Sequence, residues 1–590
     1  MILPPPFVPE NSVFRGVGVG QGVAIGPVHL INSSKIRYNR YKLTSPQMIE
    51  RELERLHKAR EKTTAKINAA RELLPEELKS QDGIFEAHLL LLSDPILINS
   101  TEQRISQDKI NAEAALTASV RRICSVMSGI EDPYIKSRLN DVEIVGQALV
   151  DAMQDQKDES VVLFQKGAIL VSRNISPAEI ISLPGNRIAA LITEQGSQTS
   201  HTSIMIMALG LPAVVGATGI ISQLEHGDTV IVDAREGHII VAPDQDAIRF
   251  YQGRQRSEES FKVEIVRSSH LPATTLDDHQ IDVFGNIELV EEIPVIMSYG
   301  AEGIGLYRTE YLYLTSKRFP LEEELFEVYR RVVASAAPRP VTIRTLDLGA
   351  DKILAASGTP ESQTNQALGL RAIRYCLKYL DIFRTQLRAI LRASAFGQVR
   401  LMLPMISSLE EIWKTKTLLA ETSQELSAEG KAMAEKIPVG IMVEVPAAVM
   451  LVNEIAKEAD FLSIGTNDLI QYTLGLDRTN PDVTDLYQPF HPSILRMIKT
   501  VIDAGQSRGL SVSVCGDMAA APQGATILVG LGADMLSMPS ASIPVIKRLI
   551  RMSLYQEMIS LSKEVLGVDT SQASLALIDS HLRGRFCEFL

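Results

Sequence analysis

The sequence predicts a multidomain α/β protein whose C-terminal part is a (β/α)8 barrel. From residue 273 to the end, short apolar segments alternate with helical segments eight times. A second alternation of strands and helices, interrupted by a long helical segment, comes before it. A chain of 590 residues has room for roughly three or four domains. Eight strands alternating with helices are typical of a closed parallel barrel, whose active site lies at the carboxyl ends of the strands.

The part before the barrel predicts two kinds of structure. Residues 13–33 are rich in Gly and Val and predict strands. Apolar residues then recur at helical spacing, which predicts helices over Ile49–Leu73, Asp82–Leu92, Ala112–Ser128 and Asp141–Gln154. Apolar runs further on predict strands over Val161–Phe164, Ala168–Ser172, Ala189–Thr193, Val230–Asp233 and Ile239–Val241. The segment 243–271 is charged and predicts a connecting helix.

These patterns divide the chain into four parts. Residues 1–42 and 158–243 form one α/β domain, and residues 43–157 form a helical subdomain inserted into it. Residues 244–272 are a linker helix, and residues 273–590 are the barrel. The predicted barrel strands are Asp282–Ile287, Gly303–Tyr307, Val341–Thr345, Arg400–Met405, Val439–Val443, Phe461–Gly465, Ser511–Cys515 and Met535–Met538.

Composition excludes several classes of protein. The net charge of −12 argues against a nucleic-acid partner. The four cysteines are scattered without a CxxC pair, which is typical of reduced thiols in the cytoplasm. The first residues lack the basic region of a signal peptide. The uncharged stretch Ile204–Ile221 is interrupted by Gly and Pro, so we expect a helix, a turn and a strand, and no membrane insertion.

His201 is the first candidate catalytic residue. It is surrounded by small hydroxyl residues, from Thr199 to Ser203, just before an apolar helical stretch. A helix N-terminus offers free N–H groups and the positive end of the dipole, which disfavours imidazolium and favours an attached anion. A neutral imidazole is a nucleophile, so the position suits a phosphoryl carrier. The alternative is an ordinary polar histidine near a helix cap.

Polar residues follow the predicted barrel strands, where an active site would lie. They are Arg308, Arg344, Glu444, Asn467, Asp468 and Cys515, with Arg371 before the fourth strand and Arg478 after the sixth. Arginine forks bind phosphate and carboxylate groups, and two carboxylates from neighbouring strands suit Mg²⁺ together with substrate oxygens. A cysteine beside anions keeps its proton and can donate it, although Cys515 can equally be a small buried hydrophobe.

At this point the sequence resembles enzyme I of the bacterial phosphoenolpyruvate-dependent sugar phosphotransferase system. The resemblance extends over nearly the whole chain and rests on separate motifs in the family's order. These motifs are Thr199–Met205, Gly300–Glu310, Leu387–Gly397, Met442–Pro446 and Ser463–Leu469. The resemblance implies that the α/β domain is a phosphohistidine domain and that the barrel binds phosphoenolpyruvate.

The resemblance also implies the reaction and its residues. Phosphoenolpyruvate with Mg²⁺ phosphorylates His201, which passes the phosphoryl group to a histidine of the carrier protein HPr. Cys515 protonates the enolpyruvate, and Glu444 and Asp468 hold the metal. The implied substrate contacts are Arg308, Arg344, Asn467, Asp468 and Arg478, with Arg371 as a further contact. A homodimer through the barrel is implied, as is HPr docking on the helical subdomain, with Glu86 and His88 on the docking face.

Some positions depart from the family pattern. Ser197 and Gln198 stand where an arginine commonly precedes the histidine motif, and Ile180 replaces a hydroxyl residue. Asp517 is one methylene shorter than the usual glutamate, and Pro539 removes a backbone donor at the last strand end. We expect these changes to alter the rate or the phosphohistidine stability without abolishing the reaction. The alternative function is a non-catalytic regulator that binds phosphoenolpyruvate or HPr.

Overall fold

The computed structural model describes residues 12–20, 22–31, 40–74, 82–128, 133–154, 166–183, 187–196, 201–314, 318–349, 368–478, 483 and 486–585. The chain divides into two compact units, Met1–Ser260 and Phe261–Leu590, each with its own core. Within the described residues, no helix is both long enough and apolar enough to cross a membrane.

The first unit is built on a mixed sheet of eight strands. These are β1 (Val13–Arg15), β2 (Val17–Val19), β3 (Val23–Leu30), β4 (Ala168–Ser172), β5 (Ile188–Thr193), β6 (Ala213–Val215), β7 (Thr229–Asp233) and β8 (His238–Val241), in the order β1-β8-β7-β3-β4-β5-β6-β2. Strands β3 to β6 are parallel where they pair, and β3, β7 and β8 pair antiparallel. The residues between β3 and β4 carry the helical subdomain, so this subdomain is an insertion into the sheet.

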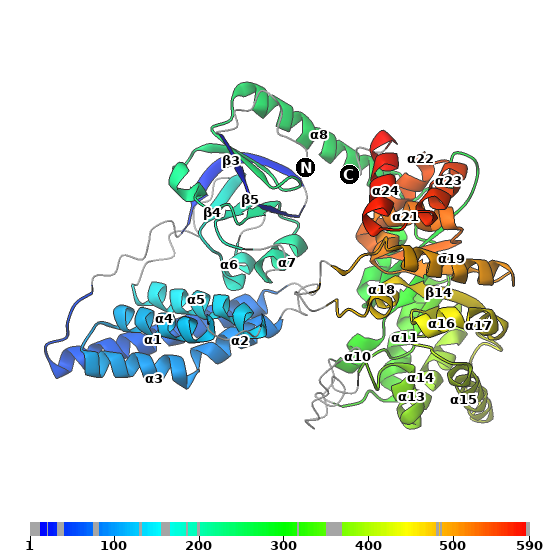
Figure 1. Cartoon of the computed structure of the whole chain (residues 1–590). Helices are drawn as coiled ribbons and strands as arrows, with labels where there is room; N and C mark the ends of the chain where they lie inside the picture. Colours follow the sequence, from blue (N-terminus) through cyan, green and yellow to red (C-terminus); the bar gives the residue numbers. More distant parts are fainter. Residues whose placement is uncertain are drawn as a thin grey trace. The chain divides into compact units, whose positions relative to one another are not determined.

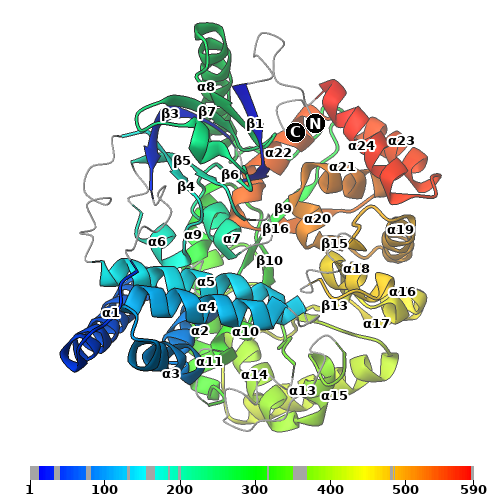
Figure 2. The same ribbon diagram turned by 60° about the vertical axis from the view of Figure 1, so that its left-hand side comes forward.

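Helices cover this sheet and extend from it (Figures 1 and 2). The inserted helices are α1 (Pro46–Glu72), α2 (Asp82–Leu92), α3 (Pro95–Gln103), α4 (Ala112–Ser128) and α5 (Pro133–Met153). Two short helices, α6 (Pro177–Ile181) and α7 (His201–Ala208), follow β4 and β5. One hydrophobic cluster joins Leu56 of α1 to Ile180 of α6 and Met205 of α7. The insertion therefore packs on the face of the sheet that carries α7. The long helix α8 (Gln245–Arg267) packs Ala247 and Tyr251 against β7 and β8.

The second unit is a closed barrel of eight parallel strands. They are β9 (Asp282–Ile287), β10 (Ile304–Tyr307), β11 (Val341–Arg344), β12 (Val399–Leu403), β13 (Val439–Val443), β14 (Phe461–Gly465), β15 (Val512–Cys515) and β16 (Met535–Met538). The main covering helices are α9 (Ile293–Ser298), α11 (Glu322–Ala336), α14 (Leu380–Ala393), α15 (Leu409–Ala428), α17 (Val452–Glu458), α19 (Pro492–Gln506), α21 (Pro522–Leu531) and α22 (Ile543–Met552). Shorter helices also follow strands, namely α10 (Glu310–Leu314), α13 (Ile373–Lys378), α16 (Pro446–Met450), α18 (Thr466–Leu474) and α20 (Asp517–Ala520). The last helices of the described residues are α23 (Tyr555–Leu566) and α24 (Ser571–Arg585).

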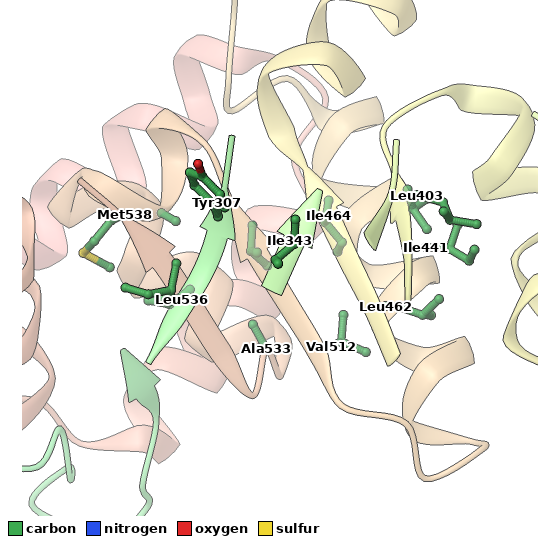
Figure 3. Close-up of a cluster of buried hydrophobic side chains, with 14 of the residues drawn as sticks. Tyr307, Ile343, Leu403, Ile441, Leu462, Ile464, Val512, Ala533, Leu536 and Met538 are labelled. Atoms are coloured by element: carbon green, nitrogen blue, oxygen red, sulfur yellow. The ribbon is translucent and has the colours of Figure 1, made fainter. Parts of the chain in front are cut away.

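Alternation along the strands separates two cores. One large cluster lies between the strands and the helices and includes Ile343, Leu403, Ile441, Leu462 and Val512 (Figure 3). A smaller cluster fills the barrel and consists of Leu306, Met402, Met442, Phe461 and Cys515. Because successive residues of a strand point to opposite faces, every second residue points into the barrel. Arg344, Glu444 and Cys515 share this inward register.

The predicted α/β architecture and the barrel are confirmed, with differences in detail. The predicted barrel strands match the observed ones within two residues. The largest difference is Arg400–Met405, since β12 ends at Leu403, where Pro404 cannot donate to the ladder. Helix α3 was not predicted, although Asp94 caps it and Pro95 begins it. Helix α5 begins at Pro133, before the predicted Asp141. The predicted strand Val161–Phe164 lies outside the described residues.

The expectation that His88 lies on the exposed face of the helical subdomain is wrong. His88 is 2% exposed, and its Nε2 lies 3.4 Å from Oδ1 of the buried Asp141. Its neighbour Glu86 is exposed. The side chain of His88 is therefore buried where α2 packs against α5.

Packing inside the barrel makes Gly440 a sensitive position. A Cβ atom there would lie 2.2 Å from the ring of Phe461. We predict that Gly440→Ala lowers the stability of the barrel by about 1–3 kcal/mol, because the ring has to move within a filled interior. Urea unfolding followed by circular dichroism measures this. The control is Gly253→Ala in α8, where a Cβ meets nothing within 4 Å. Equal stability of Gly440→Ala and the parent chain would contradict the packing.

Candidate active site at the carboxyl ends of the barrel strands

A chain of ion pairs crosses the carboxyl ends of the barrel strands. Arg344, the last residue of β11, donates from Nη2 to Oε1 of Glu310 at 3.0 Å, and its Nη1 lies 3.0 Å from Oδ2 of Asp347. Arg371 holds both oxygens of the same Asp347, at 2.7 Å from Nε and 3.0 Å from Nη2. Nη1 of Arg371 lies 3.3 Å from Oδ1 of Asp468. Residues from four separate segments thus form one network.

Burial and charge explain the protonation of this network. Burial lowers the pKa of Arg344, but the carboxylates of Glu310 and Asp347 outweigh this effect and raise it overall. Burial raises the pKa of Asp347, and Arg344 and Arg371 more than reverse it, so the net pKa is lowered. For Glu310, burial prevails over Arg344, and the pKa is raised. Both arginines therefore stay charged and oriented inside the protein.

Glu444 is the second carboxylate of the site. It follows β13, is 1% exposed, and its Oε1 accepts the Met405 N–H at 2.6 Å. Its Oε2 lies against Gly465, because a Cβ on Gly465 would meet that atom at 2.6 Å. Burial, followed by the charges of Asp468 and Asp347, raises the pKa of Glu444 well above its usual value.

The donor set fits a hard divalent cation. Two neighbouring carboxylates that repel each other in a buried place are stabilised by a cation between them. Within the described ranges, no three His, Cys, Asp or Glu side chains form a group that could hold a metal ion. Glu444 and Asp468 would supply only part of the coordination shell of such a cation, and substrate oxygens or water would complete it.

Cys515 ends β15 inside the barrel. Its Sγ lies 3.5 Å from the carbonyl oxygen of Ile464 and 3.8 Å from Oγ of Ser463. Burial, and then the charge of Glu444, raises the pKa of Cys515 to about 11. The side chain is therefore a neutral thiol near neutral pH, and it has a proton to give.

The remaining candidate residues lie around this network. Asn467, the second residue of α18, accepts the Asp517 N–H at 3.0 Å and donates to Oδ2 of Asp517 at 3.1 Å. Arg308 is 42% exposed and pairs with Glu288 at 2.7 Å. Arg478 is exposed, and its N–H donates to Oε1 of Gln471 at 3.2 Å. The structure thus links Arg344 to Arg371 through Asp347 and pairs Arg371 with Asp468, whereas Arg308 and Arg478 lie nearer the solvent.

His201 belongs to the other unit. It is the first residue of α7, and the next residue, Thr202, donates from Oγ1 to the carbonyl oxygen of Ile175 at 3.3 Å. The His201 side chain, Ser197 and Gln198 lie outside the described part of the structure. Ile180 is buried in the cluster beneath α7. The network at the carboxyl ends of the strands and the residues around it are here called the strand-end cluster. His201 and the strand-end cluster are therefore on different units of the chain.

The sequence assigned no role to the groups that orient the arginines. Glu310 and Asp347 stand in the same short motifs as Arg308 and Arg344, which was a usable signal. Tyr472 was also missed, and its hydroxyl accepts from Nη1 of Arg371 at 3.1 Å. No sequence signal shows that the Met405 N–H holds Glu444, because that contact depends on how the chain turns after Pro404.

Three family models match the chain along its length. They are the PEP-utilising enzyme N-terminal model over residues 15–138, the mobile-domain model over 164–237 and the PEP-binding domain model over 262–555. The last of these covers the strand-end cluster, and the mobile-domain model covers His201.

Curated relatives match nearly the whole chain. Phosphoenolpyruvate-protein phosphotransferases from Listeria monocytogenes, Staphylococcus carnosus and Geobacillus stearothermophilus are 34%, 35% and 35% identical to it. Each match covers 96% of this chain, and 99%, 99% and 98% of the respective relative. With this identity over almost its full length, the chain belongs to the phosphoenolpyruvate-protein phosphotransferase family, the enzyme I family of the sugar phosphotransferase system.

Proposed function

We propose that this chain transfers the phosphoryl group of phosphoenolpyruvate to His201 and then to a histidine of HPr. The observation that carries the proposal is the buried network of Arg344, Arg371 and Asp468 beside Glu444. A small trianion needs fixed cations, and phosphoryl transfer depends mainly on positioning and charge neutralisation. The family model that covers these residues describes a PEP-binding domain.

In the proposed first step, the first unit supplies the nucleophile, and the barrel unit supplies the substrate-binding groups and the proton donor. The imidazole of His201 attacks phosphorus, and the bond from phosphorus to the enolate oxygen breaks. Arg308, Arg344, Arg371, Asn467 and Arg478 bind the anionic oxygens of the substrate. The thiol of Cys515 gives its proton to the methylene carbon of the enolate, which yields pyruvate, and the thiolate recovers a proton from water.

Glu444 and Asp468 are the proposed metal ligands. Mg²⁺ bound there supplies charge neutralisation at the phosphoryl and enolate oxygens. The two carboxylates hold their positions through the Met405 N–H and the Arg371 guanidinium.

The proposed second step takes place on the first unit. Helices α1 to α5, within residues 43–157, form the docking platform for HPr, next to α7 and its His201. The exposed residues of α2, such as Glu86, belong to this platform, and the buried His88 does not. In this division, residues 1–42 and 158–243 form the phosphohistidine domain, 244–272 the linker and 273–590 the barrel.

Labelled phosphoenolpyruvate tests this function directly. We predict that the chain with Mg²⁺ takes up label that is stable in base and labile in acid, and that His201→Ala takes up none. Addition of HPr should move the label to HPr. Absence of label on the parent chain would favour a non-catalytic regulator. Label that stays on the chain in the presence of HPr would contradict the proposed acceptor.

The raised pKa of Cys515 gives a second prediction. Alkylation needs the thiolate, and burial keeps the folded Cys515 protonated up to a pH of about 11. We therefore predict slow modification by iodoacetamide at pH 8, rising steeply only above pH 10. In urea, the same peptide should react with a midpoint near a pH of ~8.5. Peptide mass spectrometry measures both rates. Equal pH profiles for the folded and unfolded chain would contradict this protonation state.

A homodimer through the barrel is the last part of the proposal. Two helices of the barrel unit carry exposed large apolar side chains, Trp413 on α15 at 47% and Met450 on α16 at 79%. We predict that Met450→Asp shifts the monomer–dimer equilibrium toward monomer, because it would bury a charge. Sedimentation equilibrium measures the shift, with Leu73→Asp, at the exposed residue that follows α1, as the control. A parent chain that is monomeric at micromolar concentration would contradict the dimer.

A further inference from the structure

The hydroxyl of Tyr487 is a buried polar group that makes no hydrogen bond within the described residues. Tyr487 lies in the segment 486–491, between α18 and α19. Its hydroxyl oxygen is shielded from solvent and has no hydrogen-bond partner among the residues that the structure describes. Buried hydroxyl groups in native proteins normally have a partner, so this one calls for an explanation.

The charged groups that act on this hydroxyl belong to the strand-end cluster. They are, in order of effect, Asp517, Arg478 and Asp468. Asp468 and Asp517 stand just after β14 and β15, so the hydroxyl lies at the carboxyl ends of these strands. The ring packs against the core between the strands and the helices, and the hydroxyl lies near charged groups of the proposed phosphoenolpyruvate site.

The nearby carboxylates already have other donors. Oδ2 of Asp517 accepts from Nδ2 of Asn467, and Oδ1 of Asp468 accepts from Nη1 of Arg371. Tyr472, the other tyrosine of the cluster, has its hydroxyl bonded to Arg371. Tyr487 differs from all of these groups, since its hydroxyl donates to no group in the described part of the chain.

The chemistry of the hydroxyl suits an anionic ligand. Burial, and then the charge of Asp517, raises the pKa of Tyr487 to about 12, so the phenol keeps its proton. Phosphoenolpyruvate has only acceptor oxygens on its phosphoryl and carboxylate groups. A protonated donor without a partner complements such a ligand, and a hydrogen bond to a charged acceptor is stronger than one to a neutral group.

We propose that the hydroxyl of Tyr487 is a further substrate-positioning group, which donates a hydrogen bond to an anionic oxygen of bound phosphoenolpyruvate. The proposal rests on the proposed function, because it needs phosphoenolpyruvate to bind at the carboxyl ends of the barrel strands. Neither the arginines nor the proposed metal ligands depend on Tyr487 for their own contacts.

The test is Tyr487→Phe in the full chain, which removes one oxygen and keeps the ring. We predict that the dissociation constant for phosphoenolpyruvate, measured by calorimetry with Mg²⁺, rises about 10-fold or more. The KM for phosphoenolpyruvate should rise with it, while kcat changes much less. The melting temperature should stay the same or rise, because no bond within the protein is lost. Tyr555→Phe, whose ring stacks on His279 ahead of β9, is the matched control and should bind normally.

The outcomes separate the role of Tyr487 from the proposed function of the site, and they distinguish the carboxylate from the phosphoryl group of the ligand. Unchanged affinity of Tyr487→Phe, with Arg308→Ala weakened, would overturn the role of Tyr487 and leave the proposed function intact. Failure of the parent chain to bind phosphoenolpyruvate would instead reject the proposed function. Weaker binding of pyruvate by Tyr487→Phe would assign the hydrogen bond to the carboxylate. Unchanged pyruvate binding, with weaker phosphoenolpyruvate binding, would assign it to the phosphoryl group.

Discussion

The carboxylate of Asp347 holds two buried arginines at once, and the candidate active site depends on this interaction. Buried arginines are costly unless they are paired, and long side chains lose entropy when they are fixed. Asp347 orients Arg344 and Arg371, Glu310 binds Nη2 of Arg344, and Asp468 binds Nη1 of Arg371. The folded protein has therefore fixed the two cations before substrate arrives, which is the preorganisation that phosphoryl transfer requires.

Strand geometry brings these groups together from distant parts of the sequence. All eight strands of the barrel run in parallel, so their carboxyl ends meet at one rim. Side-chain alternation then selects which residues face inward, and Arg344, Glu444 and Cys515 share that register. Small residues make space for them, as at Gly465, where a Cβ would collide with Glu444, and at Gly516, where it would collide with Thr466. The barrel strands thus position Arg344, Glu444 and Cys515 of the candidate site.

Sequence patterns predicted the barrel well because its strands are short, apolar and regularly separated by helices. They also located polar residues directly after the strands, because the sequence motifs occur where the strands end. The patterns did not reveal which carboxylate orients which arginine, because that depends on side-chain packing across strands. The family resemblance placed His88 on the docking face, and no sequence pattern showed that this polar side chain is buried, because its burial depends on how α2 packs against α5. The lone hydroxyl of Tyr487 has no sequence signal, because burial without a partner is a property of the folded chain alone.

The central claim is that Asp347 holds Arg344 and Arg371 in position for an anionic substrate. Asp347→Asn keeps the volume of the side chain and removes its charge, so it tests this claim most directly. Calorimetric titration with phosphoenolpyruvate and Mg²⁺ is the measurement, and Glu327→Gln, in an exposed ion pair with Arg330, is the control. The account predicts that affinity falls by about 10-fold or more in Asp347→Asn, with the barrel still folded by circular dichroism. Affinity equal to that of the parent chain in a folded Asp347→Asn would contradict it.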